Sequence, residues 1–252
     1  MPDPVVGNYG DQHVRVYDRL YGARFTPDAA VAALVAAAGP DGRLLEMGMG
    51  TGRLAVPLAE RGLQVDGIEA STAMITQFRD QRDNPPGIVV FHADLADFDL
   101  PRKDYAVAVC AVSTLFMLPG PVDQASCLAS VSRHLRPGGR LFVEAFRPDP
   151  TRFDDSGNRI EERDDVEGRH IVRSHHDPHE HSIHIVHELE GESGWDSYEV
   201  VLHYLTPEEL DDLASAAGLD RVGRWHDWTG APATSGSSDP VSVYAPAGEA
   251  DL

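Results

Sequence analysis

The chain has 252 residues, of which 42% are hydrophobic and 25% are charged, with 23 glycines and 18 prolines. This length and composition are typical of one large or two small globular domains, and they exclude collagen-like, disordered and membrane classes. The 41 acidic residues outnumber the 21 basic ones and give a net charge of -20, which repels nucleic acids and anionic membranes. We therefore expect no nucleic acid or membrane partner, but a small or cationic one.

Cysteine usage and the N-terminus indicate a cytoplasmic protein. Two cysteines, Cys110 and Cys127, are too few for a disulfide framework, which indicates a reducing compartment. Residues 1–18 contain no apolar segment of the kind that a secretory signal requires. Residues 105–122 carry no charge and approach the length that spans a bilayer, but the Pro-Gly-Pro at 119–121 interrupts them. The first half of this run is better explained as a buried strand.

Strands and helices alternate through the first part of the chain. The expected helices are Pro27–Ala38, Leu54–Arg61, a helix capped by Ser71 that runs to Arg82, and Val122–Leu135. The expected strands are Arg43–Met47, Leu63–Glu69, Ile88–Phe91, Tyr105–Val112 and Arg140–Glu144. This alternation implies a parallel sheet with helices on both faces.

The pattern then changes to three β-rich runs joined by short turns, and these predict a small antiparallel lid inserted into the α/β domain. The runs are Arg169–His176, His181–Glu190 and Asp196–Leu205. A helix that begins at the capping box Thr206–Glu209 and strands at Leu219–Trp225 and Val241–Tyr244 follow them. We expect an α/β core from residues 1–150 and 206–246 and a lid from 151–205. The exposed edge of this lid would pair between the subunits of a homo-oligomer.

A glycine-rich turn follows the first strand. It reads E-x-G-x-G-x-G from Glu46 to Gly52, and glycine there lets a ligand approach the backbone where a side chain would clash. The next two strands end in the acidic residues Glu69 and Asp94. A carboxylate at the end of the second strand accepts hydrogen bonds from both hydroxyls of an adenosine ribose, and Asp94 is placed to read an adenine amino group. These residues predict an adenosine pocket at the carboxyl edge of the sheet.

The glycine spacing separates the possible adenosine cofactors. A dinucleotide fold uses G-x-G-x-x-G to bring a pyrophosphate to a helix N-terminus, whereas the spacing here is G-x-G-x-G. The Glu46 carboxylate at the end of the strand would repel a pyrophosphate and attract a cationic amino group. An adenosine, a sulfonium and an amino acid occur together in S-adenosylmethionine, which we therefore expect as the cofactor.

With these motifs the sequence resembles the class I S-adenosylmethionine-dependent methyltransferases over about residues 40–146. The segments that carry the resemblance are Glu46–Gly52, Val65–Met74, Asp94–Leu95 and Leu135–Leu141. The runs Tyr9–Tyr21 and Cys110–Phe116, with the β insertion, look more narrowly like the N-methyltransferases that tailor amino sugars and lincosamide antibiotics. The resemblance implies a Rossmann-like α/β sheet with an inserted antiparallel β lid.

The resemblance also implies which residues hold the cofactor. Glu46 would lie near the methionine amino group, Glu69 on the ribose and Asp94 at the adenine amino group. Met74 would lie on the adenine face, although a plain helix-core position explains it equally well. Arg24 is a candidate partner of the cofactor carboxylate, with a surface position as the alternative. The full set of expected cofactor-binding residues is Tyr21, Arg24, Glu46, Gly48, Gly50, Gly52, Glu69, Ala70, Met74, Asp94, Leu95 and Ser113.

Methyl transfer to an amine depends on positioning more than on a base. A neutral amine is already a nucleophile, and orientation can supply up to about 7 to 11 kcal/mol of acceleration. The expected catalytic residues are Tyr9, Tyr17 and Phe116, as an aromatic mouth over the sulfonium with a cation–π attraction of about 0.5 to 2 kcal/mol. One of the tyrosine hydroxyls would orient the acceptor. The alternative for these three residues is simple packing.

Seven of the twelve histidines lie between His170 and His187 in the expected lid, which raises the question of a metal centre. On a strand His184 would face away from His181 and His187, and both cysteines are distant in sequence. We therefore expect no metal. The interpretation that remains is a polar lid rim, in which His175 and His176 contact the substrate.

The leading hypothesis is a cytoplasmic S-adenosylmethionine-dependent N-methyltransferase that acts on an amine of a small natural product, such as an amino sugar or a lincosamide intermediate. The acidic surface would attract such a cationic substrate. An O-methyltransferase is the alternative, and it would need a base such as His175 or His176 to deprotonate the hydroxyl. A non-catalytic adenosine-ligand binding protein and an NAD-dependent reductase are the alternatives from other classes.

Overall fold

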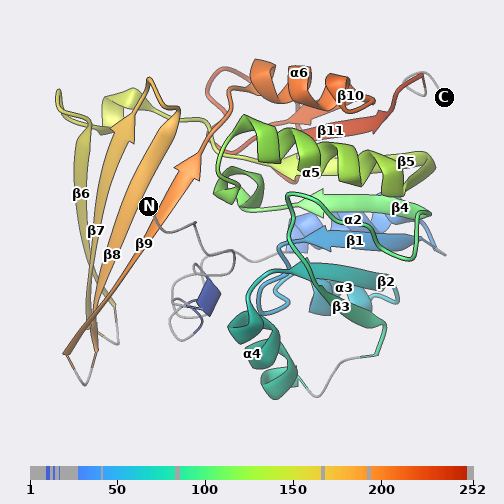
Figure 1. Ribbon diagram of the computed structural model, residues 1–252, viewed down its shortest axis with the longest axis horizontal. Helices are drawn as coiled ribbons and strands as arrows, with labels where there is room; N and C mark the ends of the chain where they lie inside the picture. Colours follow the sequence, from blue (N-terminus) through green and yellow to red (C-terminus); the bar gives the residue numbers. More distant parts are fainter. Residues whose placement is uncertain are drawn as a thin grey trace.

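Two separate sheets make up the fold, as Figure 1 shows for this computed structural model. The described residues are 10, 11, 14, 17, 28–40, 42–82, 86–165, 168–191 and 194–248. The central sheet contains β1 (Arg43–Met47), β2 (Gln64–Glu69), β3 (Ile88–His92), β4 (Tyr105–Cys110), β5 (Leu135–Glu144), β10 (Leu219–Trp225) and β11 (Val241–Pro246).

The strand order of the central sheet is β10-β11-β5-β4-β1-β2-β3. Strands β1 to β5 pair in parallel, whereas β11 is antiparallel to both of its neighbours. The order reverses between β1 and β4, and open α/β sheets bind ligands at such a switch point, beyond the carboxyl ends of the strands. The tips of β1, β2 and β4 are therefore the place to look for a site.

Helices cover both faces of this sheet, as the sequence predicts. The helices are α2 (Asp28–Ala38), α3 (Ala55–Glu60), α4 (Thr72–Arg82), α5 (Pro121–His134) and α6 (Pro207–Ala216). Leu34, Leu58 and Phe78, from α2, α3 and α4, pack in one apolar cluster. Leu128 of α5 and Leu210 of α6 belong to a second cluster. The sheet is thus the middle layer of three, and only its ends are open to a ligand.

Two predicted helix starts are confirmed by their capping contacts. The hydroxyl of Ser71 accepts a hydrogen bond from the backbone N–H of Met74 at 3.1 Å and begins α4. Thr206 and Glu209 form a reciprocal capping box that begins α6, with the Thr206 N–H donating to Glu209 Oε2 at 2.7 Å. Both caps satisfy N–H groups that have no partner within the helix, which is why the sequence marks these ends clearly.

The segment expected to form a lid is a four-stranded antiparallel sheet, called the lid sheet below, and the expectation of three strands was wrong. Its strands are β6 (Asn158–Asp165), β7 (Gly168–Asp177), β8 (Ser182–Gly191) and β9 (Gly194–His203), paired in chain order. The sequence NRIEERDD of β6 contains one large apolar residue, Ile160, and that side chain is 59% exposed. An edge strand of this kind is held by backbone hydrogen bonds to β7 rather than by an apolar pattern, so periodicity does not reveal it.

The uncharged run at residues 105–122 does not form one continuous element. It is divided among β4, a short 3-10 helix η1 (Thr114–Met117) and the first turn of α5. No helix in the described part of the chain is both long and apolar enough to cross a membrane. Figure 1 shows the lid sheet standing beside the carboxyl edge of the central sheet, so that β9 approaches η1.

Candidate functional site

The glycine turn lies where three strand tips meet. Gly48 and Gly50 adopt left-handed backbone conformations, with φ of 69° and 58°. A side chain on Gly48 would also clash, because its Cβ would lie 2.4 Å from Cγ2 of Thr114 on the neighbouring tip of β4. Glycine is required at this position by both backbone conformation and space, because the Thr114 methyl group lies where a side chain would be.

The carboxylate of Glu46 is buried at the end of β1. Its side chain is 5% exposed, and no hydrogen-bond partner of Oε2 exists among the described residues. Burial raises the pKa of Glu46 to about 8, although the nearby positive charge of Arg53 and the backbone N–H of Ala55 oppose the rise. A buried carboxylate with one unpartnered oxygen is suited to bind a cation that arrives with a ligand.

Glu69 ends β2 and holds the glycine turn from the side. Its Oε2 accepts a hydrogen bond from the Gly50 N–H at 2.8 Å, and its Oε1 accepts one from the Ser71 N–H at 2.8 Å. Burial raises the pKa of Glu69, and these two N–H donors oppose that rise because they favour the ionised form. Carboxylate oxygens can accept further hydrogen bonds, so both remain able to bind ribose hydroxyls.

The remaining wall of the expected adenosine pocket comes from the ends of β2 and β3. Asp94 lies after β3, where its Oδ1 accepts a hydrogen bond from the Ala96 N–H at 2.9 Å. His92 Nε2 and the carbonyl of Ala70 lie 3.0 Å apart, which ties the two strand tips together. Met74 is 2% exposed, and its position does not separate adenine contact from helix packing. Leu95 is half-buried beside Asp94.

The N-terminal segment contributes two described residues to this site. A Cβ on Gly50 would lie 3.8 Å from the Tyr17 hydroxyl, so the Tyr17 ring adjoins the glycine turn. Asp11 Oδ1 accepts hydrogen bonds from the Ser71 hydroxyl at 2.6 Å and the Ala73 N–H at 3.2 Å, which attaches this segment to the start of α4. Asp11 was not predicted as a site residue, since nothing in its local sequence pattern connects it to a helix sixty residues later. Of the other expected residues, Tyr9, Tyr21 and Arg24 lie outside the described part of the chain.

The loop after β4 is held in an unusual conformation by Glu144 at the end of β5. Val112 and Ser113 both have left-handed backbones, with φ of 51° and 57°, which a β-branched residue strongly disfavours. Glu144 Oε2 accepts a hydrogen bond from the Val112 N–H at 2.7 Å, and its Oε1 accepts one from Trp228 Nε1 at 2.9 Å. The Ser113 hydroxyl accepts a third bond, from the Phe146 N–H at 3.1 Å. Strain of this kind is often found at functional sites.

Glu144 and Trp228 were missed as site residues. The signal that could have found Glu144 is the one that found Glu46 and Glu69, because all three carboxylates lie at or one residue before the end of a central strand. Phe116, an expected catalytic residue, lies in η1, is 1% exposed and meets the ring of Phe146 edge to face at 5.3 Å. Its ring forms part of the wall beneath the loop, and its catalytic role stays a prediction.

The two lid histidines expected to contact the substrate have different surroundings. His175 is exposed, and its Nδ1 lies 3.1 Å from Asn158 Oδ1. His176 is buried, with its Nε2 2.9 Å from the Tyr204 hydroxyl and its ring against Phe153. Burial lowers the pKa of His176, which keeps the ring neutral. Within the described residues no three metal-binding side chains lie close enough to hold an ion.

The fold and the strand-tip site define a class I S-adenosylmethionine-dependent methyltransferase. The cofactor fits the residues present, because the buried Glu46 carboxyl has an oxygen without a partner in the described residues, which a cationic amino group can compensate. When bound, S-adenosylmethionine supplies a methyl group on a sulfonium. The family model described as "Methyltransferase domain" matches residues 44–139.

Similarity over almost the whole length establishes the family. The chain is 34% identical to the CcbJ methyltransferase of Streptomyces caelestis, with 95% of this chain and 98% of that chain covered and a TM-score of 0.86. It is 26% identical to the cypemycin N-terminal methyltransferase of a Streptomyces species over 96% of this chain and 98% of that protein. It also resembles CalS10, an amino pentose methyltransferase of Micromonospora echinaspora solved with S-adenosylmethionine, at 25% identity, 92% and 96% coverage and a TM-score of 0.69. The chain belongs to the methyltransferase family. This membership favours the methyltransferase hypothesis over a non-catalytic adenosine-ligand binding protein or an NAD-dependent reductase.

The buried Glu46 carboxyl predicts a pH-dependent affinity for the cofactor product S-adenosylhomocysteine. With a pKa of about 8, the group is mostly protonated at neutral pH, whereas its ionised form attracts the ligand ammonium. Affinity should therefore increase as the pH rises from 6.5 toward 8 and then level off. Titration calorimetry in buffers of different ionisation enthalpy should detect proton release on binding at pH 7. The Glu46→Gln variant should bind more weakly at pH 8 and lose the slope, and an unchanged slope would contradict this role.

The Glu144 contacts predict that this carboxylate fixes the strained loop. In the Glu144→Gln variant one N–H donor, that of Val112 or Trp228, must face the amide NH2 group instead of an oxygen. We expect hydrogen exchange of residues 111–115 to accelerate about tenfold or more, since a bond to a charged group contributes about 1.5 to 3 kcal/mol. Trp228→Phe keeps the Val112 bond and should have a smaller effect. Mass spectrometry of exchanged peptides measures this, and equal protection in all three proteins would show that the loop is held by other contacts.

Proposed function

We propose that this methyltransferase transfers the methyl group to an amine nitrogen of a small natural product, such as an amino sugar or a lincosamide-type intermediate. The supporting observation is the chemistry of the strand tips around the glycine turn. The loops that follow β1, β4 and β5, residues 47–50, 111–114 and 144–146, carry a carboxylate, hydroxyls and apolar or aromatic side chains but no lysine, histidine or cysteine. At the end of β3, His92 already contacts the Ala70 carbonyl, and burial raises the pKa of the Cys110 thiol in β4. A neutral amine needs no base before it attacks, so this environment suits an amine better than a hydroxyl.

The proposed reaction forms one bond and breaks one. The nitrogen lone pair attacks the methyl carbon, the carbon–sulfur bond breaks with its electrons on sulfur, and the new ammonium then releases a proton to solvent. The chain's own residues would hold the two reactants in line: Glu46 and Glu69 at the cofactor, and Tyr17 beside the glycine turn. An ammonium product also gains from the acidic protein, whose net charge is -20.

Relatives support the amine as acceptor, while the hydroxyl stays the second candidate. Two of the similar proteins are named for an amino pentose and for a peptide N-terminus, which are both amines. A hydroxyl acceptor would need a base. Of the two histidines expected in that role, His176 is the one whose pKa is lowered by burial. Its Nε2 already contacts the Tyr204 hydroxyl, so it would have to exchange that partner to act.

Residues 151–205 would form a lid over this site in a cytoplasmic enzyme, and we propose that the lid also joins subunits. Its sheet has two open edges, β6 and β9, and Ile160 and Trp195 on them are 59% and 51% exposed. Exposed apolar edge strands favour pairing with a second copy. Sedimentation equilibrium should show a dimer or larger oligomer that the double variant Ile160→Lys, Trp195→Lys dissociates. A wild-type monomer at all concentrations would contradict self-association.

The proposed acceptor class is tested with matched substrates. An amino sugar and its hydroxyl counterpart are incubated with the enzyme and S-adenosylmethionine, and NMR locates the transferred methyl group. We expect methylation on nitrogen and little or none of the hydroxyl compound. Methylation on oxygen at a comparable rate would reject the proposal and favour the second candidate.

Two variants separate cofactor binding from acceptor orientation. Glu69→Ala should weaken binding of S-adenosylhomocysteine by tenfold or more, since it removes charge-assisted hydrogen bonds of about 1.5 to 3 kcal/mol each. Tyr17→Phe should lower turnover while affinity for S-adenosylhomocysteine stays within about twofold, because only the hydroxyl that would orient the acceptor is lost. Equal losses of affinity and turnover in both variants would contradict this division of roles.

A further inference from the structure

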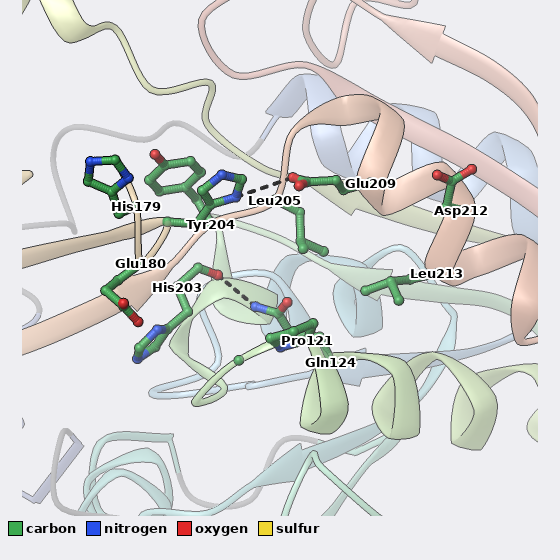
Figure 2. Close-up of a pocket in the computed structure, with 12 residues that line it drawn as sticks. Pro121, Gln124, His179, Glu180, His203, Tyr204, Leu205, Glu209, Asp212 and Leu213 are labelled. Carbon is green, nitrogen blue, oxygen red and sulfur yellow. Dashed lines mark hydrogen bonds and ion pairs between the residues drawn. The ribbon is translucent and has the colours of Figure 1, made fainter. Parts of the chain in front are cut away.

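The lid sheet joins the core at the peptide group between His203 and Tyr204, where β9 ends. The His203 carbonyl accepts a hydrogen bond from Gln124 Nε2 of α5 at 2.6 Å, and Figure 2 shows this amide pointing at that carbonyl. The Tyr204 N–H donates to the carbonyl of His181, just before β8, at 2.8 Å. Both ends of one peptide group are therefore bound, one by the core and the other by the turn between β7 and β8.

Gln124 is buried although its amide is only partly satisfied. The side chain is 0% exposed, and its Nε2 also donates to the Leu115 carbonyl at 3.4 Å. Two carbonyl acceptors fix the NH2 group on that side, while no donor to Oε1 exists within the described part of the chain. Burying an amide oxygen without a donor costs free energy, and methionine, a side chain of similar length, would avoid that cost. What this glutamine contributes is therefore its NH2 group and the link between the two carbonyls that it joins.

The second of these carbonyls belongs to η1, the element that carries Phe116. The ring of Phe116 meets that of Phe146 at 5.3 Å between centroids, and Phe146 meets Tyr204 at 6.4 Å. These three rings run from the loop after β4 to the end of β9. Gln124 thus ties together the two ends of one aromatic row, η1 in the core and the bound peptide group of the lid sheet.

Two other kinds of contact between the lid sheet and the core are less able to fix its orientation. Ile183 of β8 packs in the same apolar cluster as Leu115, but apolar packing is not directional. His181 Nδ1 lies 3.4 Å from Glu209 Oε2 (Figure 2), yet these side chains are 41% and 43% exposed, and exposed ion pairs contribute little. A hydrogen bond from a buried amide is both directional and protected from water, so Gln124 is better placed to set the angle of the lid sheet.

We propose that Gln124 is a positioning residue for methyl transfer, which holds the lid sheet at a fixed angle to η1 and so aligns the acceptor with the methyl group. It acts through the two carbonyls that its amide joins and not on a reactant. The role rests on the proposed function, in which residues 151–205 cover the site. Alignment contributes to the rate of transfer, so its loss should lower turnover. Cofactor affinity should not change, because Glu46 and Glu69 lie on β1 and β2.

Substitution of Gln124 tests this role with the acceptor that the matched-substrate assay identifies, the amino sugar or its hydroxyl counterpart. Gln124→Met keeps the length of the side chain but removes the NH2 group. We expect kcat/KM for the acceptor to fall about tenfold or more, while affinity for S-adenosylhomocysteine stays within about twofold. Gln64→Met makes the same substitution at an exposed position that begins β2 and should behave like the wild type.

Gln124→Glu separates the hydrogen bond from packing by its pH dependence. Burial should raise the pKa of the introduced carboxyl, and its protonated form can donate to the His203 carbonyl whereas its ionised form cannot. The variant's kcat/KM should therefore be close to that of the wild type at pH 6.5 and should fall toward the Gln124→Met value at pH 9. A constant ratio to the wild type, wild-type kcat/KM in Gln124→Met, or equal losses of turnover and cofactor affinity would each overturn the proposal. If Gln124→Met fails to fold, the pH series of Gln124→Glu carries the test.

The angle of the lid sheet is measured without an acceptor. Cys110 and Cys127 are buried, so nitroxide labels are attached at exposed positions of β9 and α2 through the substitutions Ser197→Cys and Ala37→Cys. With S-adenosylhomocysteine bound, double electron–electron resonance should give one narrow distance for the labelled protein and a broader or shifted distribution once Gln124→Met is added. Identical distributions would overturn the proposal. If neither acceptor is methylated, the proposed function fails, and these distances still decide the role of Gln124.

Discussion

The Glu46 carboxyl ends β1 in a place where ionisation is unfavourable until a cation binds beside it. Its burial raises its pKa to about 8, and one of its oxygens has no partner in the described residues. A folded protein keeps such a group only where another molecule compensates it, because an apolar residue would pack there without that cost. We propose that the amino group of the cofactor provides this compensation. The central sheet places the carboxyl at the tip of β1, beside the glycine turn.

The other strand tips are arranged around that constraint through contacts distant in sequence. Glu69 holds the glycine turn through the Gly50 N–H, while Glu144 holds the left-handed loop after β4. That loop in turn presses the Thr114 methyl group against Gly48. Carboxylates at the ends of two strands, β2 and β5, therefore fix two loops whose backbone conformations are unfavourable in isolation. These contacts restrain the two loops against one another.

Elements marked by local chemistry could be predicted from the sequence. Strand β10 has its predicted bounds, Leu219–Trp225, and the caps at Ser71 and Thr206 are found where the sequence places them. Strand β6 was missed because an edge strand with alternating charges has no apolar period, and its stability comes from pairing with β7. Backbone hydrogen bonds between strands leave no pattern of apolar residues in the sequence.

The candidate site divides in the same way. Glycines and acidic strand ends follow from motif and register, so Glu46 and Glu69 could be named in advance. The left-handed conformation of Val112 could not, because valine disfavours it and the residue that enforces it, Glu144, is 32 positions away. Gln124 is still less visible, since a glutamine in a helix usually faces solvent, and its burial depends on carbonyls of η1 and of β9. These parts of the structure depend on contacts between segments that are far apart in the sequence.

The acidity of the whole protein does not by itself decide where a cationic ligand binds. A net charge of -20 raises the local concentration of any cationic amine, but a general field does not choose where the amine stays. Selection needs a buried acceptor that lacks a donor, and among the described residues Glu46 Oε2 at the tip of β1 is such an acceptor. Because burial raises the pKa of Glu46 to about 8, a cation that binds beside this carboxyl also favours its ionised form.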